Sequence, residues 1–112
     1  MESPRKVLIS GAGLVGSLMA IAMKKRGHHV ELYELRSDMR KQDSLAGKSI
    51  NLIITAKGIN PVINLGLWES VKTVITPVTG RMMHSKSAEL TYQPYGKDET
   101  ECNYSVSRAE LN

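Results

Sequence analysis

Apolar and polar positions near the start of the chain change period twice, as they do in a strand–helix–strand unit. Val7, Leu8 and Ile9 form a short continuous apolar run, which is typical of a buried parallel strand. The apolar residues that follow recur at spacings of three and four, which predicts a helix with one apolar stripe. The stripe comprises Leu14, Val15, Leu18, Met19, Ala22 and Met23. A second strand is predicted at residues 30–34.

The end of this helix is marked by charge and by a glycine. Lys24, Lys25 and Arg26 occupy its last turn, where cations interact favourably with the helix dipole. Gly27 then suits the left-handed conformation that commonly ends a helix. Residues 7–34 therefore predict a compact βαβ unit.

Shorter elements are predicted after this unit. We expect a loop over residues 36–47, a strand over 49–54 and a helix over about 55–65. Pro61 removes a backbone donor, so this helix kinks or restarts near it. Gly66 ends the helix, and residues 67 and 68 pack back. Residues 71–78, which are β-branched and include Pro77, predict a short helix followed by a turn or an edge segment.

The last third of the chain predicts an antiparallel pair and the start of another helix. Residues 81–84 and 90–92 have the pattern of paired strands. Ser107 and Glu110 have the spacing of a capping box, which predicts a helix beginning after Ser107. Because the chain ends one turn into that helix, we expect a fragment of a longer protein.

The turn between the first strand and the first helix has the spacing G-x-G-x-x-G. Gly11 permits a tight turn, Gly13 lets a diphosphate approach the backbone, and Gly16 lets the helix pack close to the strand. The phosphates would meet the free N–H groups and positive dipole end of the helix. A glycine-rich turn without a ligand is the alternative.

An acidic residue at the end of the second predicted strand complements the glycine loop. Glu34 follows Gly16 by 18 residues, where a carboxylate can accept hydrogen bonds from ribose hydroxyls. Its negative charge disfavours a 2′-phosphate, so NADP is not expected at this site. The residues alone leave FAD and NAD both open.

Composition excludes several other classes of function. The net charge of +4 is mild and no basic cluster is interleaved with aromatic residues, so nucleic-acid binding is not expected. The one cysteine, Cys102, forms no intrachain disulfide, which fits a reducing compartment. The histidines lack metal-ligand spacing, so no metal site is expected. There is no secretory signal and no apolar run of about 18 residues that would span a membrane.

Motifs along nearly the whole chain are similar to those of a known family. In order they are "GAGLVGS", "YELR", "KSINL", "GRMMH", "PYG" and "SVSRAELN". They resemble the N-terminal part of the class A flavoprotein aromatic hydroxylases, in the branch that acts on L-kynurenine. The first motif is shared by many enzymes, and the later ones are more specific. The resemblance implies an α/β fold: an incomplete Rossmann-like FAD-binding domain over residues 1–112, in which about residues 78–96 begin an antiparallel, substrate-facing sheet.

The resemblance also implies site residues. The positions that match FAD contacts of the family, beside the glycines, are Val15, Tyr33, Glu34, Arg36, Ile53 and Arg108. Arg81 and Tyr95 match substrate-binding positions, and a guanidinium binds an amino-acid carboxylate through two parallel hydrogen bonds. Arg108 has a further argument, because a cation in the first turn of a helix opposes the dipole and so favours an anionic partner.

The implied reaction is the FAD- and NADPH-dependent hydroxylation of L-kynurenine to 3-hydroxykynurenine by O₂. No residue pattern in this chain requires a catalytic acid or base. Eukaryotic members are expected on the mitochondrial outer membrane through a C-terminal region beyond this chain, and the protein is otherwise expected in the cytoplasm. The alternatives are another FAD-dependent aromatic monooxygenase, an NAD-linked oxidoreductase, or a non-catalytic truncated fragment.

Overall fold

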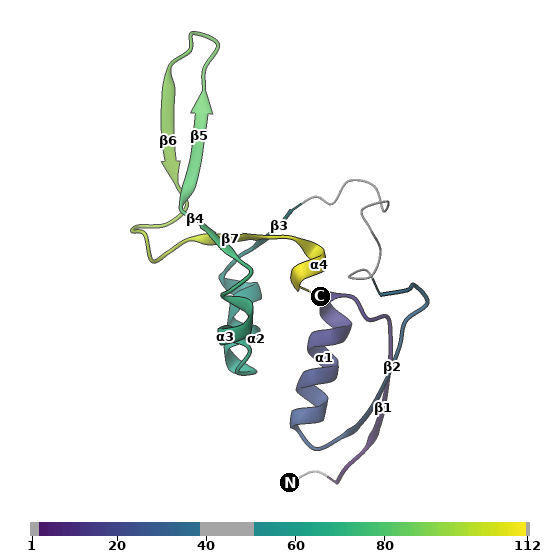
Figure 1. Ribbon diagram of the computed structural model, residues 1–112. Coiled ribbons are helices and arrows are strands. Elements are labelled where there is room, and N and C mark those ends of the chain that lie inside the picture. Colours follow the sequence, from purple (N-terminus) through teal and green to yellow (C-terminus); the bar gives the residue numbers. More distant parts are fainter. Residues whose placement is uncertain (1–2, 39–50, 112) are drawn as a thin grey trace. The chain divides into compact units, whose positions relative to one another are not determined.

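The computed structural model describes residues 3–38 and 51–111 of the chain, which divide into two compact units. The first unit contains β1 (Lys6–Ser10), α1 (Leu14–Lys25), β2 (His29–Tyr33) and α4 (Arg108–Leu111). The second contains β3 (Leu52–Ile54), α2 (Ala56–Asn64), α3 (Trp68–Val71), β4 (Thr76–Val78), β5 (Gly80–His84), β6 (Leu90–Pro94) and β7 (Asn103–Val106) (Figure 1).

The first unit is built around a parallel strand pair. β1 and β2 pair from Lys6 opposite His29 to Ser10 opposite Tyr33, and α1 packs against both strands (Figure 1). Parallel neighbours require a crossover connection, which α1 provides here. The predicted βαβ unit is therefore confirmed, with strand ends that differ from the prediction by one residue.

The C-terminus of α1 is closed by the motif that Gly27 predicts. Gly27 has a φ of 86°, and its N–H donates to the carbonyl of Lys24 at 2.9 Å. The next N–H, of His28, donates to the carbonyl of Met23 at 3.1 Å. These two bonds form a Schellman motif, which satisfies carbonyls that the helix end would otherwise leave unpaired.

The predicted apolar stripe of α1 is partly wrong. Val15 and Met19 are 80% and 45% exposed, although they share the expected helical spacing. The helix residue that lies against Gly11 and the Ile9 side chain of β1 is Gly16. Val15 lies about 100° around the helix from that contact, because an α-helix has about 3.6 residues per turn.

In the second unit, a short antiparallel sheet is backed by α2. The strand order is β3-β7-β4, and α2 packs on β3 and α3. The buried apolar side chains are those of Ile59, Val62 and Val106, from α2 and β7. The predicted strand over residues 49–54 is present from Leu52, while residues 49 and 50 lie outside the described ranges.

Proline 61 does not divide α2. The helix is a single element with Pro61 inside it, and the Leu65 N–H donates to the Pro61 carbonyl at 3.0 Å. Proline removes the bond of its own nitrogen and crowds the carbonyl four residues earlier, but the bonds that follow it form, so the helix continues past Pro61 without restarting. The helix ends at Asn64, and Gly66, which follows the C-cap residue Leu65 with a φ of 69°, stops it as predicted.

Two elements beyond α2 differ from the prediction. The short helix is α3, which begins three residues before the predicted range of residues 71–78 and ends at its first residue, and Leu67 is its N-cap. Residues 76–78 form the edge strand β4, so the predicted edge segment is confirmed there. The central strand β7 was not predicted, because a segment of four residues is too short for its polar–apolar alternation to stand out and its partners β3 and β4 are distant in sequence.

The predicted antiparallel pair is confirmed as the hairpin of β5 and β6. Its register runs from Gly80 opposite Pro94 to His84 opposite Leu90. Apart from Gly80, the residues of both strands are exposed, and Figure 1 shows the hairpin extending from the end of β4. Among the residues that the structure describes, no helix is long and apolar enough to cross a membrane.

Candidate functional site

The glycine loop connects the end of β1 to the start of α1, and its first glycine makes the turn. Gly11 has a φ of 101°, a left-handed conformation that other residues rarely adopt. Its N–H donates to the carbonyl of Tyr33, the last residue of β2, at 2.7 Å. This bond holds the loop beside the carboxyl ends of the two parallel strands, where open α/β sheets bind ligands.

The last glycine of the loop sets the distance between helix and strand. A Cβ on Gly16 would collide with the carbonyl oxygen of Gly11 and would lie 3.5 Å from the side chain of Ile9. Only glycine fits this contact, because backbone atoms cannot move aside as a flexible side chain can. The close helix–strand packing expected at Gly16 is therefore present.

The middle glycine has no such packing constraint. Gly13 is the N-cap residue of α1 with an ordinary extended backbone, and a Cβ there would meet no atom within 4 Å. The protein's own packing therefore does not require glycine at this position. The open space beside Gly13 is where a diphosphate would need to approach the backbone.

The start of α1 is suited to an anion. No side chain caps Gly13 and no acidic residue lies in the first turn, while Lys24 and Lys25 lie in the last turn. The first hydrogen bond of the helix runs from the Ser17 N–H to the Gly13 carbonyl at 2.9 Å. The N–H groups before Ser17 have no carbonyl partner inside the helix, so they and the dipole attract negative charge.

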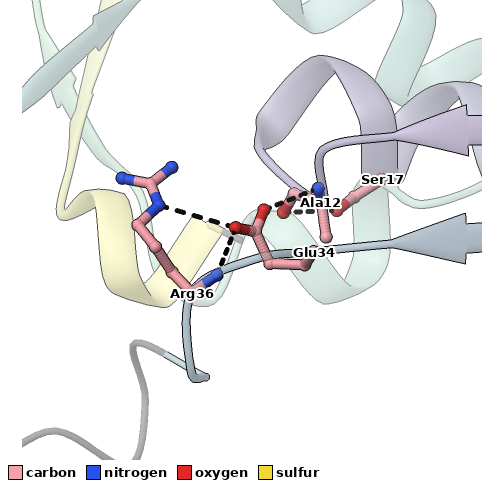
Figure 2. A network of polar contacts seen from close by, with 4 residues as sticks. All are labelled: Ala12, Ser17, Glu34 and Arg36. Atoms are coloured by element: carbon pink, nitrogen blue, oxygen red, sulfur yellow. Dashed lines mark hydrogen bonds and ion pairs between the residues drawn. The ribbon is translucent and has the colours of Figure 1, made fainter.

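Glu34 lies directly after β2 and reaches back to the loop (Figure 2). Its Oε2 accepts a hydrogen bond from the Ala12 N–H at 2.8 Å. Its Oε1 accepts one from the Arg36 N–H at 2.8 Å and lies 3.5 Å from the Arg36 Nε. The carboxylate is thus held in place by the loop on one side and by the segment after β2 on the other.

These contacts keep Glu34 charged. The hydrogen bonds from the N–H groups of Arg36 and then Ala12 lower the pKa of the Glu34 carboxyl, because they stabilise its ionised form. A carboxylate offers about four acceptor positions on its two oxygens. The two backbone donors leave capacity for the two hydroxyls of a ribose, so the position is chemically suited to the sugar of a dinucleotide.

Other residues that the resemblance places near FAD surround this loop in sequence or lie in the same unit. Val15 is in the first turn of α1, and Tyr33 is 60% exposed with its hydroxyl donating to Glu31 at 2.8 Å. Arg36 pairs with Glu34, so the structure brings these two predicted residues together. Arg108 is the first residue of α4, which confirms the predicted helix start, and its side chain is exposed.

The remaining predicted residues lie in the second unit. Ile53 is the middle residue of β3 and is 56% exposed. Arg81 lies in β5 opposite Gln93, and its Nε–H donates to the Gln93 Oε1 at 2.7 Å. The Tyr95 N–H donates to the Thr79 carbonyl at 2.9 Å, which extends the ladder by one pair. Arg81 and Tyr95 therefore lie at the same end of the hairpin.

Sequence reasoning missed two partners of the predicted residues. The Ala12 N–H is a backbone group, so no residue type identifies it as the partner of Glu34. Gln93 could have been found from the register, because extending the predicted pairing of residues 81–84 with 90–92 places it opposite Arg81. Among the described residues, no group of three His, Cys, Asp or Glu side chains could hold a metal ion.

Known proteins of one functional class match this chain. The family model of pyridine nucleotide-disulphide oxidoreductases matches residues 6–76. Kynurenine 3-monooxygenase of Myxococcus xanthus is 45% identical over 100% of this chain, which covers 25% of that protein. The enzyme of the same name from Anopheles gambiae is 40% identical over 99% of the chain and is covered to 23%. The chain thus spans about a quarter of the length of these relatives.

Solved structures match the fold. A putative FAD-containing monooxygenase from Photorhabdus luminescens has a TM-score of 0.66 at 22% identity, over 97% of this chain and 27% of that one. A probable FAD-dependent monooxygenase from Pseudomonas aeruginosa has a TM-score of 0.61 at 22% identity, over 95% of this chain and 27% of that one. The expected α/β fold with a βαβ start is therefore confirmed.

Proposed function

Because this chain belongs to the pyridine nucleotide-disulphide oxidoreductase family and resembles kynurenine 3-monooxygenases along its whole length, we propose that it is the FAD-binding part of an enzyme that hydroxylates L-kynurenine. The product is 3-hydroxykynurenine, and the co-substrates are NADPH and O₂. One observation of the structure supports the proposal most strongly. The loop at Gly13 is open, starts a helix without a side-chain cap, and has a fixed carboxylate, Glu34, beside it.

The charge of Glu34 favours FAD over NADPH at this loop, and the resemblance to FAD-containing monooxygenases favours FAD over NAD. Its diphosphate would accept hydrogen bonds from the N–H groups at the start of α1, and Glu34 would accept hydrogen bonds from its ribose. NADPH carries a 2′-phosphate on that ribose, and the ionised Glu34 repels it. We therefore assign the loop to FAD, with NADPH as a co-substrate that binds elsewhere.

When bound, FAD supplies the redox chemistry by accepting electrons from NADPH and activating O₂. This chain's residues bind and orient the cofactor. Beside the glycines and Glu34, the residues proposed to contact it are Val15, Tyr33, Arg36, Ile53 and Arg108. The exposed apolar side chains among them offer contact area, and the arginines offer positive charge to the diphosphate.

The hairpin carries the proposed substrate contacts. L-Kynurenine has an amino-acid carboxylate, which the guanidinium of Arg81 would bind by two parallel hydrogen bonds. Tyr95, at the same end of the hairpin, offers an aromatic face and a hydroxyl. On this proposal, residues 78–96 begin a sheet that faces the substrate. No residue of the chain is proposed as a catalytic acid or base.

The location of the protein follows from the family resemblance alone. For a eukaryotic source we propose the mitochondrial outer membrane, with attachment by residues outside this chain, and for other sources the cytoplasm. Imaging of a fluorescent fusion of the full-length protein tests this. A diffuse signal in a eukaryotic cell of origin would contradict the membrane assignment.

The function is tested with the purified full-length protein. We expect bound flavin in its absorbance spectrum and L-kynurenine-dependent oxidation of NADPH, with 3-hydroxykynurenine as the product in mass spectrometry. A protein that binds NAD without flavin would instead be an NAD-linked oxidoreductase. Flavin binding with turnover of a different aromatic compound would identify another hydroxylase.

A further inference from the structure

We infer that Gln93 is a positioning residue for Arg81, which orients the guanidinium for a substrate carboxylate. This inference rests on the proposed function. The two residues lie directly opposite each other in the β5–β6 ladder, so their side chains share one face of the hairpin. The Arg81 Nε–H donates to the Gln93 Oε1 at 2.7 Å, a short bond for a charged donor and a neutral acceptor.

The bond leaves the carboxylate-binding part of the guanidinium available. A guanidinium has five N–H donors in a fixed planar fork. Gln93 takes the donor on Nε, and among the described residues no other side chain bonds to Arg81. The four donors on the two terminal nitrogens remain, and they match the two oxygens of a carboxylate that approaches end-on.

The end of the hairpin that holds this pair is itself fixed. A Cβ on Gly80 would lie 2.5 Å from the Tyr92 ring and 2.5 Å from the Gln93 carbonyl oxygen, so only glycine allows this approach. The Tyr92 hydroxyl is 2.9 Å from the Thr79 hydroxyl, which holds the ring over Gly80. The backbone on both sides of Arg81 and Gln93 is therefore constrained, while both side chains are exposed.

Gln93 contributes because an exposed arginine is otherwise free to rotate. Ordering a long side chain on binding costs free energy, and a residue that orders it beforehand reduces that cost. Gln93 does this without adding charge. A carboxylate at position 93 would instead compete with the substrate for the guanidinium.

The test compares variants of the full-length protein on two substrates. Gln93→Met keeps the length of the side chain and removes the acceptor, and Thr91→Val is the control, two residues away on the same exposed strand. The substrates are L-kynurenine and kynuramine, which lacks the carboxylate.

For Gln93→Met we expect the KM for L-kynurenine to rise about tenfold, as for one lost hydrogen bond to a charged group. We expect kcat and the KM for kynuramine to stay within twofold, and Thr91→Val to match the wild type.

A second comparison separates positioning from a merely structural role. Lysine has no equivalent of Nε–H, so Gln93→Met should add no further rise in KM when Arg81 is already lysine. Equal rises for both substrates, or additive effects in the double variant, would overturn the inference while leaving the proposed function intact.

If the wild-type protein does not hydroxylate L-kynurenine, the proposed function is refuted and kinetics cannot test Gln93. Crystal structures of the full-length wild type and of the Gln93→Met variant then show whether Gln93 orients the Arg81 guanidinium. Loss of the single Arg81 orientation in the variant supports the inference, and an unchanged guanidinium overturns it.

Discussion

The glycine loop and the β5–β6 hairpin carry the two proposed binding sites, and they are built in opposite ways. In the loop, the groups that meet the ligand are backbone N–H groups, fixed by a left-handed Gly11 and by the helix–strand contact at Gly16. In the hairpin, the groups are exposed side chains, and a hydrogen bond between Arg81 and Gln93 restrains the guanidinium. The binding groups of the loop are therefore positioned by the spacing of its glycines, and those of the hairpin by pairs of side chains on opposite strands.

This difference determines what a substitution does. A change in the loop acts on the backbone, so it alters the fold or excludes the ligand. A change in an exposed side chain such as Arg81 or Gln93 of the hairpin leaves the fold intact and alters the affinity for one substrate. Substitutions in the full-length protein can test this contrast.

The largest effect is expected for Gly16→Ala. The added methyl collides with the Gly11 carbonyl, so α1 must move away from β1. We expect the free energy of unfolding to fall by about 2–3 kcal/mol, the cost of overpacking a close contact, and FAD to be lost. Denaturant unfolding and flavin absorbance measure both. Unchanged stability would show that α1 is not packed as described.

Gly13→Ala should separate ligand binding from folding. A Cβ at Gly13 meets no protein atom within 4 Å, so the stability should change by less than about 1 kcal/mol. The methyl occupies the approach of the diphosphate, and we expect the Kd for FAD to rise about thirtyfold, or about 2 kcal/mol. Fluorescence titration of the apoprotein with FAD measures this. Wild-type affinity would mean that the diphosphate does not pass Gly13.

In the hairpin, Arg81→Lys should leave both stability and FAD binding unchanged. Lysine keeps the charge but loses the planar fork, so we expect the KM for L-kynurenine to rise about tenfold. Steady-state kinetics with a matched Lys86→Arg variant, which changes an exposed residue of the hairpin turn, provides the control. A KM within twofold of the wild type rejects Arg81 as the carboxylate ligand.

The smallest effect is expected from the charge of Glu34. Its lowered pKa means that the ionised carboxylate is fully present at and above its ordinary pKa and is lost as the pH falls through the lowered value. The affinity for FAD should therefore stay constant from neutral pH down to the ordinary glutamate pKa of about 4.3 and weaken only as the pH falls below it. Glu34→Gln should bind FAD a few-fold more weakly at neutral pH and lack this acidic loss. Identical pH profiles of the two proteins would exclude the role.

The same contrast explains how much could be predicted from the sequence. The βαβ unit, Gly27, Gly66 and the hairpin were predicted because each depends on neighbouring residues and a known spacing. The central strand β7 was missed because it pairs with β3 and β4, which are far away in sequence. The prediction of one apolar stripe on α1 was partly wrong because Gly16, which carries no hydrophobic side chain, makes the contact with Gly11 and Ile9.

The candidate sites also differed in how far the sequence alone could predict them. The spacing of the three glycines and Glu34 predicted a dinucleotide loop, and the loop has the geometry that this requires. Nothing in the residues alone assigned Arg81 or Tyr95, which rested on family resemblance. An exposed arginine on a strand is common, and its role depends on a ligand whose identity the local pattern does not encode.

A crystal structure of the full-length protein with FAD would show whether the glycine loop binds the diphosphate. We expect diphosphate oxygens about 2.7–3.2 Å from N–H groups at the start of α1, beside Gly13, and ribose hydroxyls bonded to Glu34. A flavin bound elsewhere, with this loop contacting only protein or solvent, would contradict it.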